Sequence, residues 1–546
     1  MNKVIKYFLF GLAFIVVGLL AGFKIKENQG SPQGMSIYSG VGKLQHTLQF
    51  IQNNYVEDVA ANKLVDDAIQ GVMEGLDPHS FYIPASEMKQ MREQMNGSFE
   101  GIGIQFNILE DTIYVETPLS GGPSEKLGIM AGDRIVTVDG ENVAGIGITN
   151  SDVTKYLKGP KGTQVLVGIL RSGFEDLLEF NITRDKIPLN SVDYAYMISN
   201  GMGYIRITRF AETTFQEFHE QLVALKEQGM ESLILDLRGN PGGYMTQAYH
   251  IADEFLKGGM GIVSTEGRIP NSQQSYESTD EVGEFEKGGL IVLIDYSSAS
   301  ASEIVSGAIQ DHDRGLIVGV RSFGKGLVQI QEEFEDGSAI RIVVSKYYTP
   351  SGRCIQKPYD KTSEEYDAEI SERFQSGEIF DETKIQVPDS LTFRTDAGRI
   401  VYGGGGIYPD VFVPDDTTGG SKYFTDLRIQ DMFRRFAAHY VDSHKTLAST
   451  YPEPRDYYEK FAVTQSLLNE FISFAEAREV PFVAEDYETS KKYIDNRIMA
   501  YIGRRLHGEE GFWPVIHKTD QVIQRARKLM PFSSELEETG QFSIAN

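Results

Sequence analysis

The strongest constraint on the fold is an alternation of apolar strands and helices between residues 190 and 344. Short apolar runs with the composition of strands occur at Ser232–Leu237, Leu290–Ile294 and Leu316–Val320. Helical spacing occurs between strands at residues 214–228 and 301–310. Strands separated by helices favour a largely parallel sheet built from βαβ units. This part of the chain therefore predicts an α/β domain.

A serine and a lysine in this region form a candidate catalytic pair. Ser300 lies in the run Ser-Ala-Ser-Ala-Ser-Glu directly after an apolar strand, and Lys325 lies between two glycines. A serine hydroxyl is a poor nucleophile until a base removes its proton, and a buried, neutral lysine can be that base. The pKa of free lysine is about 10.4, and burial brings catalytic lysines to about 7–8. Apolar neighbours of Lys325, including Phe323 and Leu327, fit such burial.

Three motifs occur in a fixed order along the chain: Gly-Ile-Gly-Ile-Gln-Phe at 101–106, Asp-Leu-Arg-Gly-Asn-Pro-Gly-Gly at 236–243, and the Ser298–Gln329 segment. Together they resemble the carboxyl-terminal processing peptidases, a family of PDZ-containing serine proteases. Several long motifs in the family's order are far more specific than one short pattern. The resemblance covers residues 40–357 and a return near 400–413. It implies a serine endopeptidase with a Ser-Lys dyad, which cleaves exported proteins whose C-terminal tail is bound by the PDZ domain.

The resemblance also implies roles for individual residues. Ser300, the middle serine of its run, is the nucleophile, and Lys325, 25 positions later, is the base. The oxyanion hole takes the backbone N–H of Ala301 and that of either Gly242 or Gly243. The amide of Gln329 orients the lysine amine. No metal or cofactor is implied, and Ser298 and Ser302 are left as candidate helix N-caps.

Strand-like runs alternate with glycine turns between residues 97 and 184, and this stretch resembles a PDZ domain. Its loop Gly101, Ile102, Gly103 and Ile104 would bind substrate. PDZ domains take an extended peptide as an added strand and hold its C-terminal carboxylate on loop N–H groups. The family's PDZ domain also helps to gate the active site, and we hypothesise that Lys158 takes part in that coupling.

Other classes of protein fit the sequence less well. A Ser-His-Asp hydrolase lacks its Gly-x-Ser-x-Gly motif here, and the nearest histidine, His312, lies between two aspartates that suggest a solvated helix end. A zincin motif is absent. A crotonase-like acyl-CoA enzyme would share the fold but not need a PDZ domain. The remaining alternative is a catalytically silent PDZ scaffold that binds protein C-termini.

Charge and the N-terminal residues predict the surroundings of the protein. A formal net charge of −26 argues against nucleic acid as a partner. Lys3 and Lys6 precede an apolar run from Tyr7 to Phe23, which indicates a signal anchor or a cleaved signal peptide. We therefore expect the catalytic part to be exported, and to be periplasmic and anchored to the inner membrane if the source has two membranes. Protein or peptide substrates are the expected partners, and homo-oligomers are possible.

The predicted fold class is α/β multidomain, and the resemblance implies a crotonase/Clp-protease-like catalytic superhelix with an inserted PDZ domain, N-terminal helices and a C-terminal helical domain. The expected segments are a signal sequence with linker (1–40), a helical region (41–96), the PDZ domain (97–184), the catalytic domain (185–357), an acidic insertion (358–392), return strands (393–415) and C-terminal helices (416–546).

Overall fold

The computed structural model describes residues 37–119, 121–171, 173–359, 363–414 and 416–543. Contacts divide the chain into two units, residues 1–76 and 77–546. In the first unit, the helical spacing predicted from Val41 to Leu76 forms two helices, α2 (Ile37–Asn54) and α3 (Ala61–Glu74). The apolar run that predicts an anchor lies outside the described residues. None of the helices among the described residues combines the length and hydropathy needed to cross a membrane.

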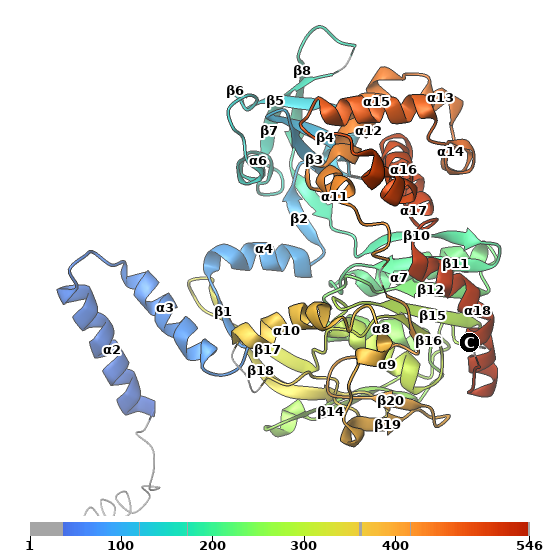
Figure 1. The fold of residues 1–546 in the computed structure, drawn as a ribbon. Coiled ribbons are helices and arrows are strands. Elements are labelled where there is room, and N and C mark those ends of the chain that lie inside the picture. Colours follow the sequence, from blue (N-terminus) through green and yellow to red (C-terminus); the bar gives the residue numbers. More distant parts are fainter. Residues whose placement is uncertain (1–36, 120, 172, 360–362, 415, 544–546) are drawn as a thin grey trace, which may run out of the picture. The chain divides into compact units, whose positions relative to one another are not determined.

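The catalytic region of the second unit is built on a six-stranded sheet, which contains the three predicted strands (Figure 1). Its order is β10 (Val192–Ser199), β11 (Met202–Ile207), β12 (Ser232–Asp236), β15 (Gly289–Ile294), β16 (Leu316–Gly319) and β21 (Val411–Phe412). Only β10 is antiparallel to its neighbour, and the other four pairings are parallel. The prediction of a largely parallel sheet is confirmed.

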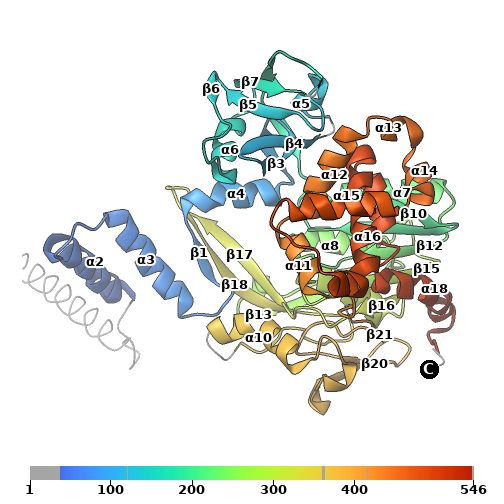
Figure 2. The same cartoon turned by 45° about the horizontal axis from the view of Figure 1, so that its top comes forward.

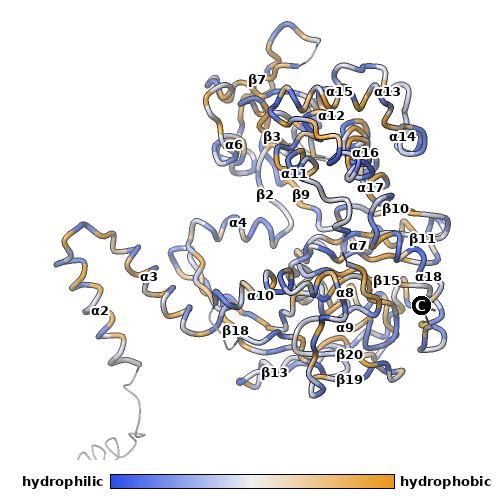
Figure 3. Tube along the Cα trace, viewed as in Figure 1, coloured by the Kyte–Doolittle hydropathy of each residue, from blue (hydrophilic) through white to orange (hydrophobic). Residues whose placement is uncertain are grey.

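Helices cover both faces of this sheet, and alternate residues of each strand point to different helices. On one face lie α7 (Thr214–Glu227), α8 (Met245–Asp253) and α9 (Ala301–Asp311), which pack on Leu290, Val292 and Ile294. On the other face α18 (Gln521–Thr539) packs on Ile291 and Leu293. Figure 3 shows the hydrophobic residues that run through these strands and helices. A strand buried on both sides explains the continuous apolar run at β15.

A second sheet is antiparallel and carries the residues that follow Lys325. Its strands are β1 (Phe81–Ile83), β18 (Ala339–Tyr348), β13 (Gly261–Gly267) and β14 (Gln274–Glu277) in that order, with β17 (Leu327–Glu333) also paired to β18. Short elements near it are α4 (Ala85–Met95), η1 (Pro270–Ser272), α10 (Ser363–Ser376), η2 (Glu382–Lys384), η3 (Asp389–Leu391) and the hairpin β19 (Thr392–Arg394) with β20 (Ile400–Tyr402).

The predicted PDZ stretch forms a separate β-rich domain with its own core. Its strands are β3 (Ile104–Leu109), β4 (Thr112–Pro118), β5 (Arg134–Val138), β6 (Glu141–Asn142), β7 (Gln164–Leu170) and β8 (Leu178–Thr183), with helices α5 (Pro123–Lys126) and α6 (Asn150–Leu157). The chain enters through β2 (Ser98–Gly101) and leaves through β9 (Asp185–Pro188), and these two strands pair with each other. A domain entered and left through one ribbon is an insertion in the surrounding fold.

The C-terminal residues are helical, as predicted, and Figure 2 shows α12, α15 and α16 lying together. The helices are α11 (Lys422–Ile429), α12 (Met432–Ser443), α13 (Leu447–Thr450), α14 (Pro454–Lys460), α15 (Gln465–Glu476), α16 (Ala484–His507) and α17 (Glu509–Ile516). They share an aromatic core that includes Phe433, Phe436 and Phe471. The last helix, α18, belongs by its packing to the catalytic sheet.

Candidate active site

Ser300 lies at a sharp turn between strand β15 and helix α9. Its backbone has φ +55° and ψ −111°, which non-glycine residues rarely adopt. Asp295 holds the preceding turn, since its carboxylate accepts the backbone N–H groups of Ser297 (2.9 Å) and Ser298 (3.0 Å). Backbone strain persists only where the surroundings impose it, and it clusters at functional sites. The turn is therefore a candidate site on conformational grounds alone.

The carboxylate of Glu303 joins the Ser300 and Lys325 segments. It is fully buried in the first turn of α9, where its Oε2 accepts the backbone N–H groups of Ser300 (2.7 Å) and Lys325 (2.9 Å). Its Oε1 accepts the N–H of Gly324 (2.7 Å) and the hydroxyl of Ser322 (2.5 Å). Burial raises the pKa of Glu303, and these four donors act in the opposite direction. One carboxyl group thus fixes both segments.

Tyr347 forms a second link between the same segments. This buried residue of β18 places its hydroxyl 3.0 Å from the carbonyl oxygen of Ser300 and also within hydrogen-bond distance of the carbonyl oxygen of Lys325. The N–H of Phe323 adds a third link, to the carbonyl of Ser298 (2.9 Å). The structure therefore brings the predicted serine and lysine into one neighbourhood.

The amine of Lys325 is in an environment that favours its neutral form. Burial lowers the pKa of Lys325, the nearby positive charge of Arg341 lowers it further, and Glu303 partly opposes both effects. Among the described residues the Lys325 amine forms no hydrogen bond, so it is not bonded to the Ser300 hydroxyl here. Catalytic hydrogen bonds in ligand-free structures are often long and tighten only with substrate bound.

Asn240 fastens the glycine loop after β12 to the start of α9. Its Oδ1 accepts the N–H of Gly242 (2.9 Å) and its Nδ2 donates to the carbonyl of Ile207 (2.9 Å). Its own carbonyl accepts the N–H of Ala299 and the hydroxyl of Ser302, both at 3.0 Å. The loop is therefore held against the serine turn by one fully buried residue, through its side chain and its backbone carbonyl.

The two glycines of this loop differ in what their N–H groups do. The N–H of Gly242 donates to the side chain of Asn240. The N–H groups of Gly243 and Ala301 have no hydrogen-bond partner among the described residues. Gly243 and Ser300 also line the same cavity. A Cβ at Gly242 would lie 2.8 Å from the Cβ of Ser300, and one at Gly243 would lie 2.1 Å from the carbonyl oxygen of Phe210. Of the two predicted glycines, the geometry favours Gly243 as an oxyanion donor.

Arg238, which follows strand β12 at the start of the glycine loop, forms ion pairs that hold this part of the chain. Arg238 lies 2.7 Å from Asp236 and 2.9 Å from Asp520 of the last turn before α18. Burial acts to raise the pKa of Asp236, but Arg238 outweighs it and lowers the pKa to about 2. The hydroxyl of Tyr204 donates a further hydrogen bond to Asp236 (2.8 Å).

A cavity of about 610 Å³ opens beside Ser300. Three methionines of helix α4, Met88, Met91 and Met95, form one wall. Gln329 also lines it, but its amide donates to the backbone carbonyl of His79 (2.5 Å), and no described hydrogen bond joins it to Lys325. The contact predicted between Gln329 and Lys325 is therefore absent from this structure.

The acidic insertion supports the lysine segment. Within the predicted insertion of residues 358–392, the structure has the helix α10. Its buried Arg373 donates to the carbonyl oxygens of Ser322 (2.7 Å) and Phe323 (3.1 Å), and pairs with Glu369 (2.6 Å). Arg321 pairs with Glu378 of the same insertion (2.6 Å). The backbone just before Lys325 is thus held by residues of the predicted insertion, Arg373 and Glu378.

The predicted peptide-binding loop of the β-rich domain has free donors. The N–H groups of Ile102 and Gly103 have no partner among the described residues. The loop leads from Gly101 at the end of β2 to Ile104 at the start of β3, which is an edge strand of its sheet. Free N–H groups beside an edge strand are what an added peptide strand requires.

Lys158 connects this domain to the wall of the cavity. Its amine lies 2.5 Å from the carboxylate of Glu93 and 4.7 Å from the centre of the Phe99 ring. Glu93 belongs to α4, the helix whose methionines line the cavity. A further ion pair joins Arg92 of α4 to Glu333 of β17 (2.5 Å).

Comparison with known proteins gives the family. Residues 201–363 match peptidase family S41, and residues 114–171 match the PDZ domain. Residues 21–86 match the activating protease CtpB N-terminal domain, and residues 423–508 match a family of unknown function. The carboxy-terminal-processing protease of Bartonella bacilliformis is 36% identical over 324 residues, which are 58% of this chain and 73% of that protein. The chain belongs to the carboxy-terminal processing proteases of peptidase family S41.

Two further similarities accompany this assignment. The carboxy-terminal processing protease CtpA of Bacillus subtilis is 33% identical over 361 residues, 65% of this chain and 76% of that protein. Among solved structures, the PDZ domain of a Vibrio cholerae carboxy-terminal protease in complex with peptide is 33% identical, with a TM-score of 0.16 over 17% of this chain and 99% of that one. The predicted family and the α/β fold class with an inserted PDZ domain are confirmed.

Other sequence expectations for this carboxy-terminal processing protease are corrected. Ser300 itself occupies the N-cap position of α9, not Ser298 or Ser302. Those two serines instead donate to the carbonyls of Leu237 (2.8 Å) and Asn240 (3.0 Å). His312 lies at the end of α9, as predicted, but it is not solvated, because its ring is buried between Asp396 and the carbonyl of Gly261. It follows the last residue of α9, about 18 Å along the helix from Ser300.

Sequence reasoning missed the residues that join the site together. Glu303 was noted only as the end of the serine run, and Tyr347 and Arg341 were not considered. The signal for Glu303 was present, since a glutamate three residues after a serine before a helix is the pattern of a capping box. Nothing local marks Tyr347, which lies in an ordinary apolar strand.

Proposed function

We propose that this protein is a serine endopeptidase of the C-terminal processing type, in which Ser300 and Lys325 form a catalytic dyad. The observation that carries this proposal is the Glu303 carboxylate, which accepts N–H groups from both residues. A buried acceptor shared by two chain segments fixes their backbones relative to each other. The lowered pKa of Lys325 supports its role as base.

The reaction follows from these positions. The Ser300 hydroxyl oxygen attacks a peptide carbonyl while Lys325 takes its proton, and the developing oxyanion accepts the N–H groups of Ala301 and Gly243. Lys325 returns the proton to the leaving amine. Water, deprotonated by Lys325, then hydrolyses the Ser300 ester. Gln329 would orient the amine only if its amide leaves His79.

Substrate selection is assigned to the PDZ domain. The loop Gly101–Ile104 would hold the C-terminal carboxylate on the N–H groups of Ile102 and Gly103, with the peptide added beside β3. We place the catalytic part outside the cytoplasmic membrane, because basic residues precede the apolar run near the N-terminus. Lys158 would link peptide capture to the cavity through Glu93 and α4.

A pair of peptides tests this assignment. Two peptides with the same apolar tail, one ending in a free carboxylate and one in an amide, are compared for kcat/KM. The free acid should be cleaved about tenfold faster or more, because hydrogen bonds from N–H groups to a charged acceptor are lost with the amide. Equal rates would contradict recognition of the C-terminus, while leaving cleavage itself established.

The pH dependence tests the environment of the base. Activity should rise with pH through the pKa of Lys325, because only the neutral amine accepts a proton. Replacing Arg341 with methionine removes a positive charge that lowers this pKa. The pKa therefore rises, and the midpoint of the pH–rate profile should move to higher pH by about half a unit or more.

The control for this shift is Arg92→Met. Arg92 lines the same cavity, but its charge is offset by Glu333 (2.5 Å), so the midpoint should stay in place. An unchanged midpoint in Arg341→Met, or a shift to lower pH, would exclude Lys325 as the titrating base.

A further inference from the structure

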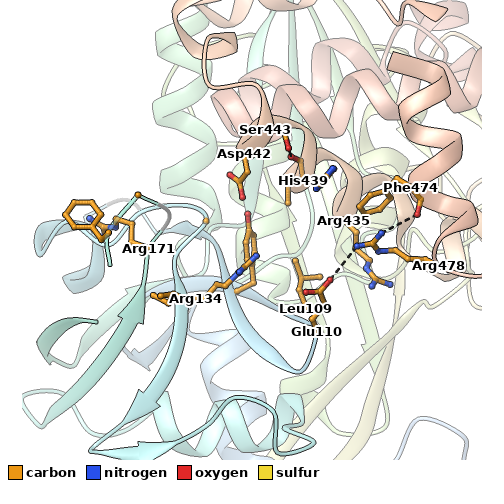
Figure 4. A pocket seen from close by; sticks show the side chains of 16 residues that line it. Leu109, Glu110, Arg134, Arg171, Arg435, His439, Asp442, Ser443, Phe474 and Arg478 are labelled. Atoms are coloured by element: carbon orange, nitrogen blue, oxygen red, sulfur yellow. Dashed lines mark hydrogen bonds and ion pairs between the residues drawn. The ribbon is translucent and has the colours of Figure 1, made fainter. Parts of the chain in front are cut away.

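A second cavity, of about 470 Å³, lies between the PDZ domain and the C-terminal helices, away from Ser300 (Figure 4). The PDZ domain contributes Arg134 of β5 and Tyr114 of β4 to its walls, and helix α12 contributes Arg435 and Asp442. Its volume is in the range of small-molecule sites. No residue proposed for catalysis or for peptide capture lines it.

Four arginines line this cavity against two acidic residues. Arg171 is paired with Asp133 (2.7 Å) and Arg478 with Glu110 (3.5 Å). In the described part of the chain, the guanidinium groups of Arg134 and Arg435 form no hydrogen bond or ion pair. Figure 4 shows these two side chains approaching the cavity from opposite walls.

Unpaired arginines facing one cavity are notable in a chain with a net charge of −26. An acidic protein has many carboxylates that could neutralise them, yet these two guanidinium groups keep their donors free. A guanidinium binds carboxylate or phosphate oxygens through two parallel hydrogen bonds. The buried side chain of Tyr114 adds a hydroxyl to the same wall.

We propose that this cavity binds a small anion with two carboxylate or phosphate groups, one held by Arg134 and the other by Arg435. A small ligand fits the volume of the cavity and its local charge, whereas the overall negative charge repels a large polyanion. Screening over about 8 Å at physiological salt lets the local arginines dominate at short range. The bound anion would join the PDZ domain to the C-terminal helices.

The test is calorimetric titration of the whole protein with inorganic pyrophosphate and, separately, with citrate, at constant ionic strength. The expected result is saturable binding of at least one probe, weakened about tenfold or more in Arg134→Gln and in Arg435→Gln. Which probe binds more tightly distinguishes phosphate from carboxylate recognition. Arg455→Gln is the matched control, because Arg455 is an exposed arginine of the helical region outside the cavity.

Thermal unfolding gives a second measurement. The probe that binds should raise the midpoint for the wild type and for Arg455→Gln but not for the double variant Arg134→Gln/Arg435→Gln. The proposal is overturned by absence of saturable binding at millimolar concentrations of both probes. It is equally overturned if all variants bind as the wild type does. Neither result bears on the peptidase proposal, since the assay needs no cleavage.

Discussion

Replacing Ser300 with alanine is expected to abolish peptide cleavage, with a fall in kcat of about 10⁵-fold or more. The hydroxyl is the proposed nucleophile, and its neighbours cannot replace it. Ser298 and Ser302 are fully buried, and their hydroxyls are committed to the carbonyls of Leu237 and Asn240. The measurement is degradation of an unfolded test protein, with folding checked by circular dichroism.

Ser298→Ala and Ser302→Ala are the matched controls. Each removes a buried hydrogen bond worth about 1 kcal/mol, so both should lower stability slightly while retaining cleavage. Cleavage by Ser300→Ala at the wild-type rate would refute the nucleophile. If the wild type binds free C-termini but cleaves nothing, the alternative of a silent PDZ scaffold is the correct one.

Replacing Lys325 with methionine is expected to lower kcat by about 10⁴-fold or more without lowering the melting temperature. Nucleophile and base act as a unit, so loss of the base alone removes most of the rate enhancement. Methionine keeps a long, flexible side chain, and the lysine amine forms no hydrogen bond among the described residues that the substitution could break. Burial disfavours the charged amine, so an uncharged side chain should be tolerated.

Lys325→Arg is the informative comparison. Arginine keeps the positive charge but is never deprotonated in proteins, so it cannot act as a base. It should be as inactive as the methionine variant. Activity restored by arginine would mean that the charge of this residue matters rather than its basicity, and the dyad would be wrong.

The sequence predicted the parts of the site that local patterns encode. An apolar run gave strand β15, the spacing of residues 301–310 gave α9, and family resemblance placed Ser300, Lys325 and the glycine loop. It did not predict what holds them together. The contacts of Glu303 with Ser322, and of Tyr347 with both segments, join residues that are distant in the chain. Tertiary packing alone decides such contacts.

The same limit applies to the acidic insertion and to His312, whose tertiary contacts the local sequence does not encode. The acidic insertion lacks a sustained apolar stripe. It is held to the chain before Lys325 by hydrogen bonds from Arg373 to the carbonyls of Ser322 and Phe323 and by the ion pair of Arg321 with Glu378. His312 was expected in solvent because aspartates flank it. Asp311 instead forms a buried ion pair with Arg353 (2.7 Å), which no pattern near residue 312 indicates. Asp311 and His312 therefore hold neighbouring segments of the fold together through buried contacts.

Covalent labelling tests the dyad most directly. The purified protein is treated with a fluorophosphonate reagent, and peptide mapping by mass spectrometry locates the modified residue. The account predicts labelling of Ser300 alone, at a rate that rises with pH through the pKa of Lys325, and no labelling in Lys325→Met. Modification of a different serine, or equal labelling of Ser300 in Lys325→Met, would contradict it.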